Sequence, residues 1–170
     1  EESKNLKKAI VSMSQTHSTN IEVVKNKKLV YNNVDGIFAC NKNYALQVKT
    51  ADCLPIFFIH KHNNIFGVIH AGWKGLKNCI ISKSTNLLKS HINDLNEITA
   101  FIGPSISQKN YEVKNEFIDY FGNKFIDKVE DKFFCNLKGV ASSQLQKIGV
   151  KNIIDCNQCT YENDNYHSYR

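Results

Sequence analysis

The feature that most constrains the fold is a pair of apolar segments separated by a short polar turn. Residues 54–59 (LPIFFI) are continuously apolar, as expected of a buried strand, and Asn63-Asn64 turns the chain into residues 65–69 (IFGVI). Antiparallel strands joined by a tight turn place the start of the first strand beside the end of the second. Cys53 precedes the first segment and His70 follows the second, so we expect these two side chains to be neighbours in space.

The rest of the chain alternates between short strand patterns and helix patterns. Residues 45–49 alternate apolar and polar side chains, a helical apolar face begins after Gly75, and Asp35-Gly36 indicates a turn. We predict a mixed α/β (α+β) domain that contains hairpins and lacks strict βαβ alternation. Its further elements are strands over 21–24, 29–31, 98–102 and 150–155, and helices over 116–121 and 137–148, the last ended by Gly149.

The composition is that of one globular domain with an apolar core. The chain has 170 residues, 42% of them hydrophobic, and only two prolines, so no proline-rich linker divides it. We therefore predict a single domain over residues 1–170. No apolar run is long enough to cross a bilayer and the first residues do not resemble a signal peptide, so we expect a cytoplasmic protein without a membrane partner.

The excess of basic side chains does not indicate a nucleic-acid partner. The formal net charge of +6 comes from 22 basic and 16 acidic side chains, but the lysines are scattered and Arg170 is the only arginine. Surfaces that bind nucleic acid usually cluster their charge and use arginine for bidentate contacts. We interpret the lysines as a solvated surface, and we predict neither a nucleic-acid partner nor an obligate protein partner.

The six cysteines include one C-x-x-C motif, formed by Cys156 and Cys159. Such a motif fits a redox pair or half of a zinc site. No second C-x-x-C or H-x-x-H motif accompanies it, and it follows a predicted strand without the helix start that lowers a thiol pKa. Redox activity is therefore disfavoured, and we expect reduced thiols.

One thiol and two imidazoles on separate short motifs are sufficient for a three-ligand metal site. His17 and Cys53 are 36 residues apart, and Cys53 and His70 are 17 apart, unlike the closely paired ligands of structural zinc fingers. Three protein ligands with one open position is the arrangement of catalytic zinc. The same residues fit a metal-free Cys53–His70 nucleophile pair, and Cys53 also fits an ordinary buried thiol. Asp52 could orient a ligand or accept a proton.

Several short motifs occur along the chain in this order: 15–18 (QTHS), 50–55 (TADCLP), 70–75 (HAGWKG), 102–106 (IGPSI), 111–113 (YEV), 159–161 (CTY) and 168–170 (SYR). Together they resemble the YfiH-like family, also called the laccase-domain or multicopper polyphenol oxidase-like family. The resemblance covers the chain from about His17 to its last residue. In that family the histidine of Gln-x-His, the cysteine of Ala-Asp-Cys and the histidine of His-Ala-Gly-Trp bind the metal, which here implies His17, Cys53 and His70.

The resemblance implies a four-layer α/β/β/α sandwich of mixed sheets and a zinc-dependent enzyme. The implied activity is phosphorolysis of purine nucleosides to the free base and ribose 1-phosphate, with deamination of adenosine as a companion activity. Oxidation of phenols with copper, and hydrolytic correction of peptidoglycan precursors, have also been attached to members and are the alternatives. A four-copper oxidase needs more histidines than the 6 present, and binding of copper in vitro is expected of such a ligand set in any case.

A nucleoside enzyme also needs a base pocket and an anion site. We predict Asp52, Cys53 and His70 as the catalytic residues. For substrate binding we predict Lys74, with Lys49 as a second lysine that could attract phosphate, and Trp73 and Tyr111 as walls for the base. The predicted small-molecule partners are a nucleoside and phosphate.

The chain departs from the family pattern at both ends. Family members usually carry an Arg-x-Gly-Gly-Val-Ser motif nearer the N-terminus and a short strand after a final Tyr-Arg-Arg, and neither is present here. We therefore expect that the sequence lacks terminal segments of the family. Residues 107–110 (SQKN) stand where a further Gly-Pro is usual, and Cys156 has no counterpart in the pattern.

Overall fold

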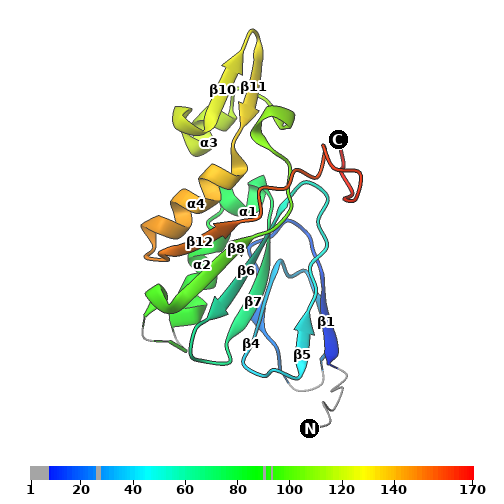
Figure 1. Cartoon of the computed structure of the whole chain (residues 1–170), viewed down its shortest axis with the longest axis vertical. Helices are drawn as coiled ribbons and strands as arrows, with labels where there is room; N and C mark the ends of the chain where they lie inside the picture. The colour runs from blue at the N-terminus through cyan, green and yellow to red at the C-terminus, as the bar shows by residue number, and fades with distance from the viewer. Residues whose placement is uncertain (1–7, 26–27, 90, 93) are drawn as a thin grey trace.

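A six-stranded mixed sheet forms the centre of the molecule. The computed structural model describes residues 8–25, 28–89, 91–92 and 94–170 (Figure 1). The strand order is β12-β8-β6-β7-β4-β2, with β6 and β7 antiparallel. The bounds are β2 (Ile21–Val23), β4 (Gly36–Ala39), β6 (Leu54–His60), β7 (Phe66–Ala71), β8 (Ile98–Ile102) and β12 (Asn152–Asp155).

The predicted hairpin is confirmed as the middle pair of this sheet. Leu54 pairs with Ala71 and Pro55 pairs with His70, so the start of β6 lies beside the end of β7. Ile56 and Phe58 are fully buried on one face of β6, and Phe57 on the other face packs against a second apolar cluster, whereas Ile59 is 56% exposed. The hairpin thus brings the segment after Asp52 next to His70.

Helices cover one face of the six-stranded sheet (Figure 1). The helices α1 (Trp73–Lys77), α2 (Ile80–Lys89), α3 (Phe117–Phe121) and α4 (Leu137–Lys147) contribute to the main apolar core together with β6, β7 and β8. On α2 the residues Ile80, Ser84 and Leu88 recur at a spacing of four and are fully buried. Complete burial of one such aliphatic side chain contributes roughly 1.5–3 kcal/mol.

The prediction of one continuous helix after Gly75 was wrong. Cys79 has a φ of 63°, and it separates α1 from α2. A left-handed residue cannot continue an α-helix. At the end of α4, by contrast, Gly149 has a φ of 101° and ends the helix as predicted.

A small parallel sheet packs against the opposite face of the six-stranded sheet. Its order is β3 (Val30–Asn32), β1 (Ala9–Ser14), β5 (Tyr44–Leu46). A second apolar cluster lies between the sheets and includes Val11, Tyr31, Ile37 and Val68. Figure 1 shows the layer order of helices, large sheet and small sheet. The mixed α/β fold with sheets packed face to face is therefore confirmed. In the part of the chain that the structure describes, the four α-helices lie on the outer side of the large sheet.

A third sheet stands at the far end of the helical side. It consists of β9 (Glu112–Val113), β10 (Ile126–Val129) and β11 (Lys132–Cys135), all antiparallel, and it appears in yellow at the top of Figure 1. The sequence does not predict these strands, nor β1 and β4, and its Asp35-Gly36 pair indicates only a turn. The other predicted strands and the helices α3 and α4 are confirmed within a few residues of their predicted bounds.

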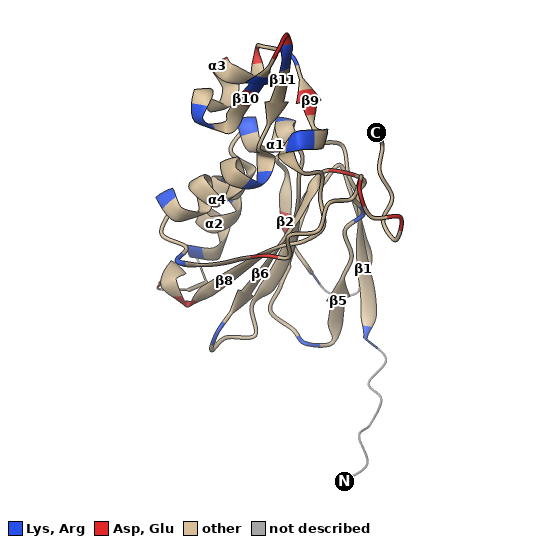
Figure 2. Cartoon of the chain, turned by 45° about the horizontal axis from the view of Figure 1, so that its top comes forward, with Lys and Arg blue, Asp and Glu red and all other residues tan. Residues whose placement is uncertain are grey.

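Among the residues described, no helix is long and apolar enough to span a membrane. Figure 2 shows lysines in helices, strands and loops on several sides of the molecule. The prediction of a single domain over 1–170 stays a prediction.

Candidate metal centre and adjoining cavity

The fold brings the three predicted metal ligands together. One donor atom from each of His17, Cys53 and His70 lies within 4.8 Å of the others. Cys53 Sγ lies 3.8 Å from His17 Nε2, and the two imidazole rings meet edge to face with centroids 4.7 Å apart. The described part of the chain contains no other group of three such side chains.

Each ligand comes from the end of a strand. His70 lies near the end of β7, and Cys53 directly precedes β6, so the hairpin register places them side by side. His17 follows β1 and has a φ of 58°, a conformation that a non-glycine residue adopts only when its surroundings hold it there. The residue that holds it is Asp35.

Asp35 connects the loop of His17 to His70. Its carboxylate accepts hydrogen bonds from the backbone N–H groups of Thr16, His17 and Ser18 and from Ser18 Oγ. It also accepts a hydrogen bond of 2.8 Å from Nδ1 of His70. Because Nδ1 is engaged, Nε2 of His70 is the nitrogen left for a metal. Asp35 is fully buried, and the sequence analysis missed it because an acid before a glycine resembles an ordinary turn residue.

The charges of this pair depend on each other. Burial disfavours protonation of His70, but hydrogen bonds to Asp35 and Cys53 outweigh it and raise the pKa of His70 to about 9. Burial likewise disfavours ionised Asp35, but hydrogen bonds from His70, Ser18 and Thr16 lower its pKa far below the usual value. Without a metal the two groups therefore form a buried ion pair.

His17 is shifted in the opposite direction. Burial and the neighbouring His70 lower the pKa of His17, so its imidazole is predominantly neutral at pH 7. A neutral imidazole is the form that binds a metal.

The donor set fits zinc. Bonds of about 2.0–2.1 Å to nitrogen and 2.3 Å to sulfur in a tetrahedron separate the donor atoms of two imidazoles and one thiolate by roughly 3.3–3.6 Å. The distance of 3.8 Å between Cys53 Sγ and His17 Nε2 is slightly longer than that, and the limit of 4.8 Å for the set likewise requires the ligands to move closer to bind an ion. Two imidazoles and one thiol are also ligands for copper, so the geometry identifies a group that could hold a metal ion.

Gly72 leaves the space that Cys53 and His17 occupy. A Cβ atom at residue 72 would lie 2.8 Å from Cys53 Sγ and 3.2 Å from Cδ2 of His17. The φ of Gly72 is −73°, which any residue adopts. The glycine is therefore required by the close approach of the ligands and not by its backbone conformation.

The ligands line a cavity of about 750 Å³, which is within the usual range for small-molecule sites. Trp73, Tyr111 and Lys49 also line it, and binding of a base by the two aromatic side chains stays a prediction. Lys74 is not among the lining residues; its Nζ lies 5.7 Å from the ring centroid of Trp73. The remaining lining residues are Gln15, Thr50, Ala51, Asp52, Tyr169 and Arg170.

Asp52 holds residues from the C-terminal part of the chain. Its carboxylate accepts hydrogen bonds of 2.7 Å from the hydroxyl groups of Thr160 and Ser168. It also accepts bonds of 2.8 Å and 3.2 Å from the backbone N–H groups of Tyr169 and Arg170. Asp52 is 7% exposed and has a φ of 83°. With both oxygens engaged, its surroundings favour a structural task over the predicted transfer of protons.

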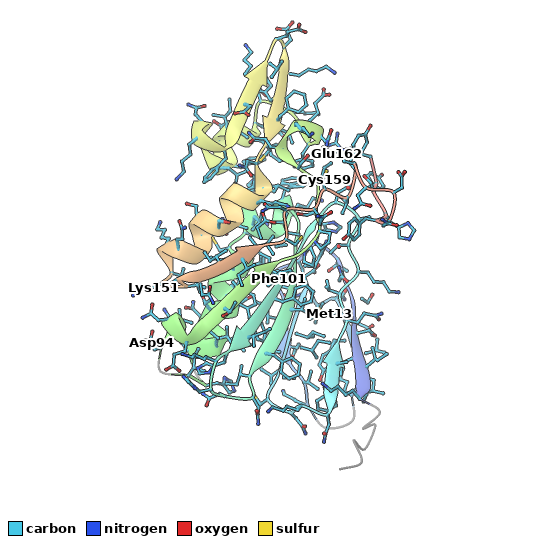
Figure 3. All side chains as sticks on the ribbon, in the orientation of Figure 1. Met13, Asp94, Phe101, Lys151, Cys159 and Glu162 are labelled. Atoms are coloured by element: carbon cyan, nitrogen blue, oxygen red, sulfur yellow. The ribbon has the colours of Figure 1, made fainter. Side chains whose placement is uncertain are left out.

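The C-x-x-C motif lies outside this cavity. The Sγ atom of Cys159 accepts a hydrogen bond from the backbone N–H of Ser107, and Figure 3 shows Cys159 near Glu162 in the C-terminal segment. Cys156 and Cys159 are both free thiols. The predicted reduced state of the cysteines agrees with this arrangement.

Comparisons with known proteins identify relatives along the whole chain. The sequence model of the family described as "Multi-copper polyphenol oxidoreductase laccase" matches residues 1–170. A protein of Campylobacter jejuni named as a purine nucleoside phosphorylase is 34% identical over 94% of this chain and 70% of its own length. One of Aquifex aeolicus with the same name is 36% identical over 80% of this chain and 64% of its own length.

Solved structures show the same fold. YlmD of Geobacillus stearothermophilus superimposes with a TM-score of 0.88 at 24% identity, covering 97% of this chain and 68% of that protein. A YfiH protein of Bacillus licheniformis superimposes with a TM-score of 0.86 at 25% identity, covering 99% of this chain and 70% of that protein. The chain thus spans roughly two thirds of the length of its relatives. With the family match and the fold in agreement, the chain belongs to the YfiH-like family of laccase-domain proteins.

Proposed function

We propose that this protein is a zinc-dependent purine nucleoside phosphorylase that also deaminates adenosine. The observation that carries the proposal is the group of His17, Cys53 and His70 lining a cavity of about 750 Å³ that has aromatic and cationic walls. The names of the relatives from C. jejuni and A. aeolicus support the phosphorylase part of the proposal. The proposed partners are a nucleoside and phosphate, in a cytoplasmic setting, without a nucleic acid, a membrane or an obligate protein partner.

Phosphorolysis requires one bond to form and one to break. An oxygen of phosphate bonds to C1′ of the ribose, the C1′–N9 bond breaks, and its electron pair leaves with the purine, which takes up a proton. Trp73 and Tyr111 offer ring surfaces against which a purine can stack. Burial raises the pKa of Tyr111, so its hydroxyl keeps its proton and can donate a hydrogen bond.

Deamination requires water to add to C6 of adenosine and ammonia to leave. Bound zinc would supply Lewis acidity and would lower the pKa of water at its open position. His17, Cys53 and His70 would hold the ion, and Asp35 would fix His70 in the tautomer that leaves Nε2 free. Asp52 would act on this chemistry through the cavity wall that it holds, because its oxygens accept four hydrogen bonds.

The test is metal analysis of the purified protein combined with incubation with adenosine or inosine, with and without phosphate. We expect about one zinc per chain, release of base only with phosphate, and conversion of adenosine to inosine without it. Cys53→Ala should abolish metal binding and both reactions, whereas Cys79→Ala, at an exposed position, is the matched control. Bound zinc without turnover of any nucleoside would contradict the proposal and favour hydrolysis of peptidoglycan precursors.

A copper-dependent polyphenol oxidase is the second candidate, favoured by the description of the matching family. The described residues provide a single group of three metal-ligating side chains. A four-copper oxidase needs a further cluster of ligands, so this candidate ranks below zinc chemistry. The test compares two rates: oxygen uptake by copper-loaded protein with a phenolic substrate, and nucleoside turnover by zinc-loaded protein. If the first rate is higher, the oxidase becomes the preferred candidate.

Catalysis by Cys53 as a metal-free nucleophile is tested by chelation. Activity that survives removal of the metal but is lost on alkylation of Cys53 would favour the thiol. We expect chelation to remove activity and zinc to restore it.

A further inference from the structure

We propose that the guanidinium group of Arg170 is the phosphate-binding group of the cavity, held in place by Asp52 and Tyr111. This inference rests on the proposed function for the identity of its ligand. It assigns the anion site to a residue that the sequence indicates only as part of the motif at residues 168–170. Lys74, the residue predicted for this task, does not line the cavity.

Arg170 is fixed at the wall of the cavity by two side-chain contacts. Its guanidinium carbon lies 5.2 Å from the ring centroid of Tyr111, within the range of a cation–π interaction. Its Nη2 donates a hydrogen bond of 2.7 Å to the backbone oxygen of Glu112. Tyr111 and Arg170 both line the cavity that contains the metal ligands. The planar group is therefore oriented before any ligand binds.

Most of the hydrogen-bonding capacity of Arg170 is unused. A guanidinium group has five N–H donors in a fixed fork. Within the described part of the chain, one donor is engaged by Glu112, and no acidic side chain forms an ion pair with Arg170. A stacked guanidinium with free donors at a cavity wall is suited to a bidentate contact with phosphate.

Asp52 couples the position of Arg170 to the metal centre. Its carboxylate accepts a hydrogen bond of 3.2 Å from the backbone N–H of Arg170, and the next residue in the chain is Cys53. The main chain at Arg170 is thus tied to the residue that precedes a metal ligand. Phosphate bound to Arg170 would share one cavity with a nucleoside near the metal. Asp52 is a positioning residue in this arrangement.

The charges that face the cavity favour an anion. Lys49 and Arg170 are its cationic lining residues. Asp52 is the acidic lining residue, but it is 7% exposed and its oxygens accept four hydrogen bonds. Both cations are exposed, but a guanidinium group can offer phosphate two parallel N–H donors, whereas the ammonium of Lys49 acts as a point charge.

Chemical modification gives a direct test, because Arg170 is the only arginine in the 170-residue chain. Phenylglyoxal should modify the peptide that contains Arg170, and mass spectrometry measures the rate. We expect inorganic phosphate to slow this modification at least about fivefold, as occupancy of a specific site does, and chloride at equal ionic strength to leave it unchanged. A rate that phosphate does not alter would overturn the inference. This measurement needs no turnover, so its result is independent of the proposed function.

Kinetics of variants test the role in the reaction. For Arg170→Gln we expect the KM for phosphate to rise about tenfold or more, and the ratio of phosphorolysis to deamination to fall by a similar factor. Arg170→Lys should recover part of the loss, and Lys109→Gln is a surface control whose partner is Glu162. Equal losses in both reactions would mean that Arg170 only supports the cavity wall and would overturn the inference. If phosphate slows the modification of Arg170 but the protein splits no nucleoside, the proposed function is rejected and the anion site is retained.

Discussion

At the scale of single residues, one buried carboxylate organises the candidate metal centre. Asp35 accepts hydrogen bonds from the loop that carries His17 and from the imidazole of His70. The sequence predicted His17, Cys53 and His70 because their motifs are distinctive. The sequence could not predict Asp35. The role of Asp35 arises from its contact with His70, which is 35 positions away and is brought close only by the fold. The same holds for Arg170 and Glu112, which are 58 positions apart.

Replacement of Gly72 by alanine should weaken metal binding roughly 10- to 100-fold, the range seen when a group that orients a ligand is lost. The new methyl group would lie 2.8 Å from Cys53 Sγ and would displace the ligand. Gly75→Ala, in the helix α1 that Gly72 precedes as its N-cap, is the matched control, because its closest contact would be an ordinary 3.4 Å. Zinc affinity measured by competition with a chelating dye decides the matter. Equal affinities for the two variants would contradict the prediction.

The ion pair of Asp35 and His70 should make the stability of the metal-free protein depend on pH. Because the pKa of His70 is raised from 6.5 to about 9, the pair stabilises fully below pH 6.5, and this contribution is lost as the pH rises through about 9. We expect the free energy of unfolding to fall by on the order of 3 kcal/mol across that window.

Urea denaturation of the chelated protein at a series of pH values measures this loss. Asp35→Asn should be less stable at pH 6.5 and should show a flatter profile, because its side chain carries no charge to hold the proton of His70. Zinc-loaded protein provides the second control. A His70 whose Nε2 binds the metal cannot take up a second ring proton, so this titration should be absent. If the stability of Asp35→Asn changes with pH in the same way as that of the unsubstituted protein, the ion pair is not the cause.

At the scale of secondary-structure elements, the hairpin was predictable and the interruption between α1 and α2 was not. Residues 54–59 and 65–69 signal strands through their apolar runs, whereas residues 73–89 show one helical pattern that continues across Cys79. Leu76 and Ile80 are both fully buried on either side of Cys79, and the left-handed φ of 63° at Cys79 is what breaks the helix between them. The strand β4 was missed because Gly36 suggests a turn, yet Gly36–Ala39 is entirely buried in the sheet.

Replacement of Cys79 by glycine should stabilise the protein by about 0.5–1 kcal/mol. Cys79 follows the C-cap Asn78 of α1 and has a φ of 63°, which is the left-handed position that usually holds glycine. Thermal unfolding measures the change. Cys40→Gly is the control, because Cys40 is also exposed but is absent from the residues with positive φ, and it should lower the stability. A loss of stability in Cys79→Gly as large as in Cys40→Gly would refute this explanation.

At the scale of the whole molecule, the main core makes one cysteine a reporter of global unfolding. Cys135 is 1% exposed and belongs to the main apolar cluster, and burial raises the pKa of its thiol to about 12. The exposed thiols of Cys40 and Cys79 should react with a thiol reagent in native buffer, whereas Cys135 should react only as the protein unfolds. Peptide mapping after labelling at increasing urea concentration follows each site. Modification of Cys135 in native buffer at the rate of Cys40 would contradict this prediction.

The contacts of Asp52 have a consequence for the order in which the protein is assembled during synthesis. The donors to its carboxylate lie 108 to 118 positions further along the chain, whereas His17, Cys53 and His70 all belong to its first 70 residues. On the ribosome the three ligands emerge long before residues 160–170, and until then water must solvate the Asp52 carboxylate. A nascent chain can therefore gather its metal ligands while the wall with Tyr169 and Arg170 is still missing, so metal capture can come early and completion of the cavity comes last.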